Sequence, residues 1–156
     1  MKVDIYDIPE NFYYIKEHEW TLVENADTAR IGITDYAQKS LREITYFYVG
    51  KKGAKVKRME TICKIESRKC AAEILSPLSG VVLSFNNGLF DNPGIINQDP
   101  YGKGWITIIR PTNLDKELEE LLKPELYAEY IKELIKIDET LLIHRWKKGT
   151  DEKTGE

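Results

Sequence analysis

The sequence has few of the residues that build metal centres and disulfide frameworks. It contains two cysteines, Cys63 and Cys70, and two histidines, His18 and His144, and these show no metal-ligand spacing. In a hairpin over residues 62–75 the two thiols would lie about 13 Å apart, whereas a disulfide needs its Cα atoms within ~7 Å. The sequence therefore predicts free thiols and argues against a structural zinc or a cysteine–histidine nucleophile pair.

Long apolar runs and an excess of either charge are also missing. No stretch approaches the roughly 18 apolar residues of a membrane span, and residues 1–4 hold no apolar signal core. The net charge of -3 and the pI of about 5.6 give no general attraction to nucleic acid or to an anionic membrane. At 156 residues we expect one soluble cytoplasmic domain with neither nucleic acid nor a membrane as its partner.

The strand-forming residues present, and the turns between them, predict a mainly β domain. Strands are expected over residues 12–23, 28–33, 44–49, 81–85 and 105–109, with a hairpin over 62–75. Thr34 or Asp35 is suited to the N-cap of one short helix near 35–41. Two prolines and several glycines predict a long ordered loop over 91–104.

The leucine spacing becomes helical after Asn113, and Pro124 is suited to the first turn of a C-terminal helix. The apolar stripe of that helix fits packing on its own domain, and docking to a partner or a second subunit is the alternative. The predicted organisation is a lead-in over 1–11, a compact β domain over 12–123, a helical extension over 124–146 and a disordered tail over 147–156.

The hairpin over residues 62–75 contains a candidate reactive amine. Folding it about the Arg68–Lys69 bond pairs Ile65 with Ala72, Cys63 with Ile74 and Lys64 with Glu73. Two-residue hairpin turns favour Asn-Gly or Asp-Gly because they need positive φ angles, so Arg68 and Lys69 are poor choices for a purely structural turn. Lys69 is therefore a candidate for chemistry. The simpler alternative is an exposed charge that discourages edge-to-edge pairing.

A series of short motifs between residues 13 and 130 occurs in one order and at consistent spacing. They are Tyr14, Lys16 and His18-Glu19-Trp20; residues 31–38; Glu66-Ser67 and Lys69 with Ala71; Ser76-Pro77 with Ser79-Gly80; and Asn97, residues 99–102 and Gly104-Trp105. In these motifs the chain resembles the H protein of the glycine cleavage system, a lipoyl carrier. The resemblance implies a barrel-sandwich hybrid of the lipoyl and biotinyl type, with lipoate joined by an amide bond to Lys69.

The same resemblance implies a carrier subunit rather than an enzyme. In that family a lipoyl ligase or transferase modifies the lysine, and a glycine decarboxylase then loads an aminomethyl group onto the lipoyl arm. An aminomethyltransferase removes this group, and a dihydrolipoamide dehydrogenase reoxidises the arm. Family members shelter the loaded arm in a cleft, which by resemblance makes Glu19 a candidate partner for the aminomethyl ammonium.

The chain departs from the family pattern beside the modified lysine, where Arg68 and Cys70 stand in place of small residues. These flanks leave a second function open, that of an H-like lipoate-binding protein carrying sulfur intermediates for a heterodisulfide-reductase-like complex. A hub that distributes lipoate to other enzymes and a binding module without lipoate are two further alternatives.

Overall fold

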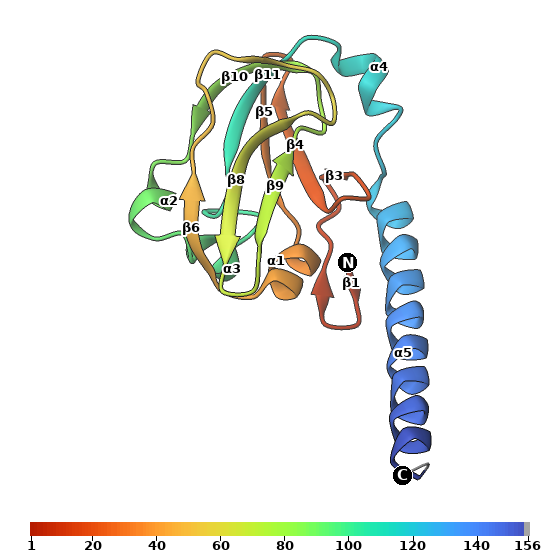
Figure 1. Cartoon of the computed structure of the whole chain (residues 1–156). Helices are drawn as coiled ribbons and strands as arrows, with labels where there is room; N and C mark the ends of the chain where they lie inside the picture. Colours follow the sequence, from red (N-terminus) through yellow and green to blue (C-terminus); the bar gives the residue numbers. More distant parts are fainter. Residues whose placement is uncertain (155–156) are drawn as a thin grey trace.

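The computed structural model describes the backbone of residues 1–154 and the side chains of residues 1–139 (Figure 1). The elements are, in chain order, β1 (Lys2–Val3), β2 (Tyr6–Asp7), β3 (Tyr13–Tyr14), β4 (Glu19–Asn25), β5 (Thr28–Ile33), α1 (Asp35–Leu41), β6 (Ile44–Tyr48), β7 (Lys55–Val56), β8 (Thr61–Ser67), β9 (Ala71–Leu75), β10 (Gly80–Phe85), α2 (Gly88–Asp91), α3 (Ile95–Gln98), β11 (Thr107–Pro111), α4 (Leu114–Leu118) and α5 (Pro124–Thr154).

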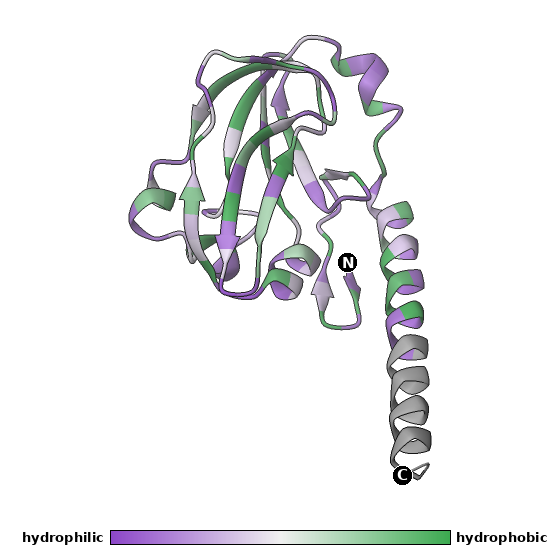
Figure 2. Cartoon of the chain, in the orientation of Figure 1, coloured by the Kyte–Doolittle hydropathy of each residue, from purple (hydrophilic) through white to green (hydrophobic). Residues whose placement is uncertain are grey.

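Two antiparallel sheets form the body of the molecule. The larger has the strand order β3-β4-β5-β11-β10-β7, and the smaller has the order β6-β8-β9. One buried cluster draws side chains from both sheets, including Ile31 and Ile109 from the larger and Ile65 and Ile74 from the smaller. Figure 2 shows the strands as mainly hydrophobic and the tip of the β8–β9 hairpin as hydrophilic. The two sheets thus enclose one apolar core, which confirms the predicted mainly β fold.

Several predicted elements appear with their expected bounds. Strand β5 covers residues 28–33, and α1 begins at Asp35. Thr34 caps this helix because its side-chain oxygen accepts a hydrogen bond from the Ala37 N–H at 3.2 Å. A capping bond of this kind stabilises a helix by about 1 kcal/mol, and it fixes where α1 starts.

The single strand predicted over residues 12–23 is wrong, because the chain turns between β3 and β4. His18 adopts a φ of 80°, and its N–H donates to the Ile15 carbonyl at 3.0 Å. Aromatic composition indicated β structure on both sides of this turn but did not reveal the turn. The loop predicted over 91–104 also contains a short helix, α3, whose two apolar residues gave too short a signal for a helical period.

Both ends of the chain differ from their sequence-based description. The predicted lead-in over 1–11 contains the β1–β2 hairpin, and Val3 and Ile8 from this segment are buried. Helix α5 begins at Pro124 as predicted but continues to Thr154, where a disordered tail was predicted from residue 147. The polar sequence at that end carries no apolar period that could have indicated a helix.

Candidate functional site

The β8–β9 hairpin has the predicted register. Cys63 pairs with Ile74, Lys64 with Glu73 and Ile65 with Ala72, and the pairing continues to Glu66 and Ala71. The Ser67 N–H then donates to the Cys70 carbonyl at 2.8 Å. Arg68 and Lys69 are therefore the two residues of the turn, and Lys69 lies at the tip, beyond the last pair of the ladder.

The Ser67 side chain organises this turn. Its hydroxyl oxygen accepts hydrogen bonds from the backbone N–H groups of Lys69 and Cys70, both at 3.1 Å, and donates to the Cys70 carbonyl at 3.1 Å. Neither Arg68 nor Lys69 has a positive φ angle. The premise that this turn needs a left-handed backbone is therefore wrong, because a serine hydroxyl satisfies the turn amides instead.

The Lys69 amine is exposed and weakly held. Its Nζ donates to the Ser40 carbonyl of α1 at 3.4 Å, which is longer than a typical N–H···O bond. Among residues 1–139 no carboxylate forms an ion pair with Lys69, whereas the neighbouring Arg68 guanidinium lies 3.0 Å from Glu43. The amine can therefore leave the surface without breaking a strong interaction.

The base of the hairpin is rigid. Ile65 and Ile74 are each 1% exposed, and β8 pairs with β6 on its other side. The Arg68 N–H also donates to the Glu43 carbonyl just before β6, at 3.3 Å. A tip tied to three strands gives Lys69 a fixed position while its side chain stays free.

The two thiols are free, as predicted, and differ in environment. Cys63 is buried in the core, and burial raises the pKa of its thiol well above the usual range. Cys70 is exposed beside Lys69. Of the two thiols, Cys70 is therefore the one accessible from solvent.

Glu19 is a buried carboxyl group, only 3% exposed. Its Oε2 accepts a hydrogen bond from the Leu75 N–H at 2.6 Å, and its Oε1 has no hydrogen-bond partner. Burial raises the pKa of this carboxyl to about 8, against the opposing effect of the Leu75 bond. Below that pH the resting protein keeps Glu19 protonated.

The structure does not bring the two predicted site residues together. Lys69 reaches toward Ser40, whereas Glu19 is bonded to Leu75, six residues further along β9. At ~3.3 Å per residue this is about 20 Å along the strand. Any contact between the two sites therefore requires a long extension of the Lys69 side chain.

His18 and Trp20 have packing roles. Trp20 is fully buried, and its indole N–H donates to the carbonyls of Ile33 at 2.9 Å and Pro100 at 3.0 Å. The His18 Nδ1 lies 2.8 Å from the hydroxyl of Tyr127 on α5, and burial lowers the pKa of this histidine to about 4. Both residues therefore hold elements together.

Sequence reasoning missed an exposed aromatic surface beside the hairpin. Tyr46 and Tyr48 of β6 point outward on either side of the buried Phe47. The available signal was the alternation of aromatic residues at a period of two, which predicts a strand but does not tell which of its faces is exposed.

Among the residues that the structure describes, no group of three or more His, Cys, Asp or Glu side chains is arranged to hold a metal ion. In the same part of the chain, no helix combines the length and apolarity needed to cross a membrane.

Comparisons with known proteins identify relatives over most of the chain. The family model described as glycine cleavage H-protein matches residues 12–134. A probable glycine cleavage system H protein of Pyrococcus abyssi is 46% identical over 134 residues, which are 86% of this chain and 99% of that protein. The probable glycine cleavage system H protein 1 of Saccharolobus solfataricus is 46% identical over 132 residues, covering 85% and 96% of the two chains.

The fold has a relative among solved structures. The crystal structure of a glycine cleavage system H protein from Mycobacterium marinum matches with a TM-score of 0.69 and 29% identity. The match covers 81% of this chain and 98% of that one.

Proposed function

The chain belongs to the glycine cleavage H-protein family, whose members are lipoyl carriers, and on that premise we propose that Lys69 is its lipoyl attachment site. The observation that carries this proposal is the Lys69 amine, exposed and without an ion pair among residues 1–139, at the tip of a rigid hairpin. An amide bond at Nζ requires such an accessible amine.

The hairpin residues fit the demands of a carrier. When attached, lipoate supplies a disulfide whose sulfur takes up the aminomethyl group. This chain supplies the fixed pivot, since the Ser67 hydroxyl holds the turn and the β6–β8–β9 sheet holds the strands. Acylation of the Lys69 amine also removes one positive charge, which takes the formal net charge from -3 to -3 - 1 = -4.

The chemistry belongs to partner enzymes in this proposal, and the chain is the carrier subunit of their system. The partners are a glycine decarboxylase, an aminomethyltransferase, a dihydrolipoamide dehydrogenase and a lipoyl ligase or transferase. We assign the carrier role to residues 12–123, with the β1–β2 hairpin and α5 packed on the outside of that unit.

Glu19 is proposed as a receptor for a cationic group on the loaded arm. Its Oε1 is buried without a hydrogen-bond partner, and an ammonium group would supply one. Because the pKa of Glu19 is about 8, such an encounter near pH 7 would be accompanied by release of a proton from the carboxyl.

Transfer of sulfur for a heterodisulfide-reductase-like complex gains no specific support. In this function Arg68 would pair with a sulfur anion, but the Arg68 guanidinium already lies 3.0 Å from a Glu43 oxygen. The exposed Cys70 does not distinguish the two kinds of cargo. Glycine cleavage is therefore the function we propose.

The test is glycine-dependent CO₂ exchange with a purified glycine decarboxylase and the lipoylated protein. We expect the wild-type carrier to support exchange, and Lys69→Arg to reduce it to the background without carrier. A fully lipoylated wild type that supports no exchange would contradict glycine cleavage and favour another cargo.

A further inference from the structure

Four exposed hydrophobic side chains on or beside β6 line the same pocket. Tyr46, Tyr48, Val49 and Phe90 are 55%, 46%, 51% and 54% exposed, and we call this surface the β6 face. Among residues 1–139 the other large hydrophobic residues with comparable exposure lie elsewhere in the chain, at Met1, Ile5, Leu126 and Ile137. Clustering of apolar and aromatic side chains on a surface is typical of a protein contact site.

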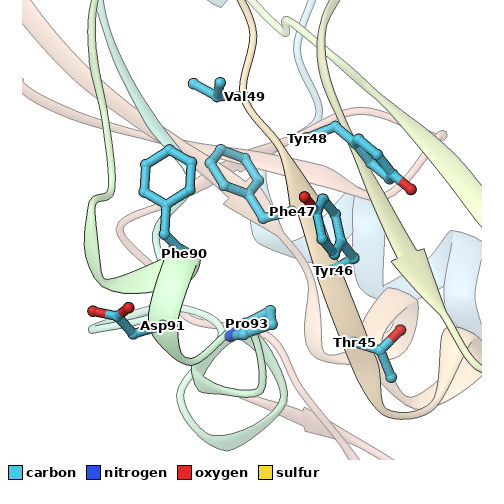
Figure 3. A pocket seen from close by; sticks show the side chains of 8 residues that line it. All are labelled: Thr45, Tyr46, Phe47, Tyr48, Val49, Phe90, Asp91 and Pro93. Carbon is cyan, nitrogen blue, oxygen red and sulfur yellow. The ribbon is translucent and has the colours of Figure 1, made fainter.

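The β6 face contains a pocket of about 440 Å³ between β6 and α2 (Figure 3). Phe47 and Phe90 lie side by side in it, with ring centroids 5.4 Å apart, and Pro93 lies below Phe90 in the view. The pocket is large enough for one or two apolar side chains, and its aromatic residues offer them apolar contacts.

The pocket also has a charged rim. Asp91 lines it and is exposed, and its carboxylate forms no hydrogen bond or ion pair with another residue of 1–139. Tyr48 donates a hydrogen bond to the Glu66 carboxylate at 2.9 Å, which places a second acidic group beside the β6 face. An occupant that fits this surface carries an apolar side chain next to a lysine or arginine.

The β6 face adjoins the hairpin tip. Ile44 at the start of β6 pairs with Ser67, and Thr45, which lines the pocket, donates through its hydroxyl to the Glu66 carbonyl at 3.2 Å. Tyr46 lies two residues beyond Ile44, which is about 7 Å along the strand. A protein that binds over the hairpin tip can therefore also contact the β6 face.

The location of the β6 face beside the hairpin tip indicates which of the proposed partner enzymes would bind there. An enzyme that forms the amide must bring its acyl donor to the Lys69 Nζ itself, so it has to rest on the surface immediately around the tip. Enzymes that act on the far end of the arm meet it a full arm's length from Lys69. The β6 face therefore fits the first kind of enzyme best.

We propose that the β6 face is the docking surface for the enzyme that attaches lipoate to Lys69. An apolar side chain of that enzyme occupies the pocket, and a basic side chain pairs with Asp91. The inference rests on the proposed function, because it requires Lys69 to be the acylated residue. In the reaction the Nζ bonds to the carbonyl carbon of an activated lipoyl donor, and the activating group and one proton leave.

The test is the rate of lipoylation by a purified lipoyl ligase, with lipoate and ATP, measured against the concentration of the unmodified carrier. Tyr46→Ser and Phe90→Ser are expected to raise the KM for the carrier about tenfold each, with kcat changed less than about twofold. Asp91→Asn should raise KM by a smaller factor and weaken its dependence on salt.

Leu126→Ser is the matched control, because it removes an equally exposed hydrophobic side chain from α5, and it should leave KM unchanged. Thermal melting checks that all variants fold, which their exposed positions favour. An unchanged KM in folded Tyr46→Ser and Phe90→Ser overturns the docking inference but leaves Lys69 as the acylated residue. Absence of acylation in the wild type overturns the proposed function as well.

Two other occupants of the β6 face would be recognised by measuring the oligomeric state and the glycine-dependent exchange of the same variants. If Tyr46→Ser converts a dimer to a monomer at unchanged KM, the β6 face contacts a second copy of the chain. If the variants are lipoylated normally but fail in glycine-dependent exchange, the β6 face serves the decarboxylase. Either result overturns the assignment to the lipoylating enzyme.

Discussion

Glu19 does not form an ion pair with another residue of 1–139, and its carboxyl is protonated at neutral pH. Its carboxyl is 3% exposed, has one hydrogen bond from Leu75, and has a pKa raised by burial from 4.5 to about 8. A protonated carboxyl avoids the cost of a buried uncompensated charge. Glu19 is therefore protonated in the folded protein at neutral pH.

Glu19→Gln should change the pH dependence of stability. Between about pH 4.5 and pH 8 unfolded Glu19 loses its proton while folded Glu19 keeps it, so the folded wild type loses stability as pH rises through this window. Glutamine stays neutral in both states. The free energy of unfolding of the variant relative to the wild type should thus increase by on the order of 4 kcal/mol between pH 4.5 and pH 9.

Urea denaturation of both proteins at pH 5, 7 and 9 measures this difference. His18, whose pKa is lowered to about 4, destabilises the fold as pH falls from 6.5 toward 4, but it is present in both proteins and cancels. Parallel stability profiles of variant and wild type would show that Glu19 is ionised in the folded protein at neutral pH.

Helix α5 is joined to the carrier unit through Tyr127. The Tyr127 hydroxyl lies 2.8 Å from both Thr34 Oγ1 and His18 Nδ1, and its ring stacks on Tyr14 with centroids 4.5 Å apart. Since Thr34 also caps α1, a single buried hydroxyl links α5 to the start of α1 and to the turn before β4. The first turns of α5 are therefore part of the folded domain, as the apolar stripe suggested.

Tyr127→Phe should lower the free energy of unfolding by about 1–3 kcal/mol, because it leaves the His18 Nδ1 without its partner and removes one of the two hydrogen bonds of the Thr34 hydroxyl. Tyr130→Phe is the matched control, since Tyr130 is three residues along α5 and its ring also lies beside His18, with centroids 5.9 Å apart. Tyr130 makes no hydrogen bond through its hydroxyl to a residue of 1–139, so its loss should cost less than about 0.5 kcal/mol. Equal effects of the two variants would contradict the role given to Tyr127.

The elements differ in how far their sequence predicted them. Strand β5, the cap at Thr34 and the hairpin register follow from alternation, capping and cross-strand pairing, which are local rules. The turn before β4 and the packed β1–β2 hairpin depend on contacts with distant segments: Thr34 N–H donates to the His18 carbonyl, and Asp7 N–H to Asp35. No local pattern contains that information.

The sequence likewise predicted one part of the candidate site and not the rest. The motif spacing was enough to select Lys69, because a motif that is collinear over most of the chain identifies a family. It did not reveal that the Ser67 hydroxyl supports the turn, that Glu19 is buried away from Lys69, or that an aromatic pocket lies beside the tip. These facts depend on side-chain positions across several strands.

At the scale of the whole molecule, the β8–β9 tip lies at one end of the sandwich and α5 covers one of its sides. The β8–β9 tip and α1 lie together at one end, while α5 runs down the side away from β6 (Figure 1). In the small sheet, β6 is the edge strand that lies furthest from α5. A partner can therefore approach Lys69 from the β6 side without displacing α5.

The most direct measurement is mass spectrometry of the protein after incubation with a lipoylating system, with fragmentation to locate the added group. We predict one lipoyl group per wild-type chain, located on Lys69, and none on Lys69→Arg, which keeps the charge but has no acylatable amine. A wild type that gains no lipoyl group, or a Lys69→Arg variant that still gains one, would contradict the assignment of Lys69 as the attachment site.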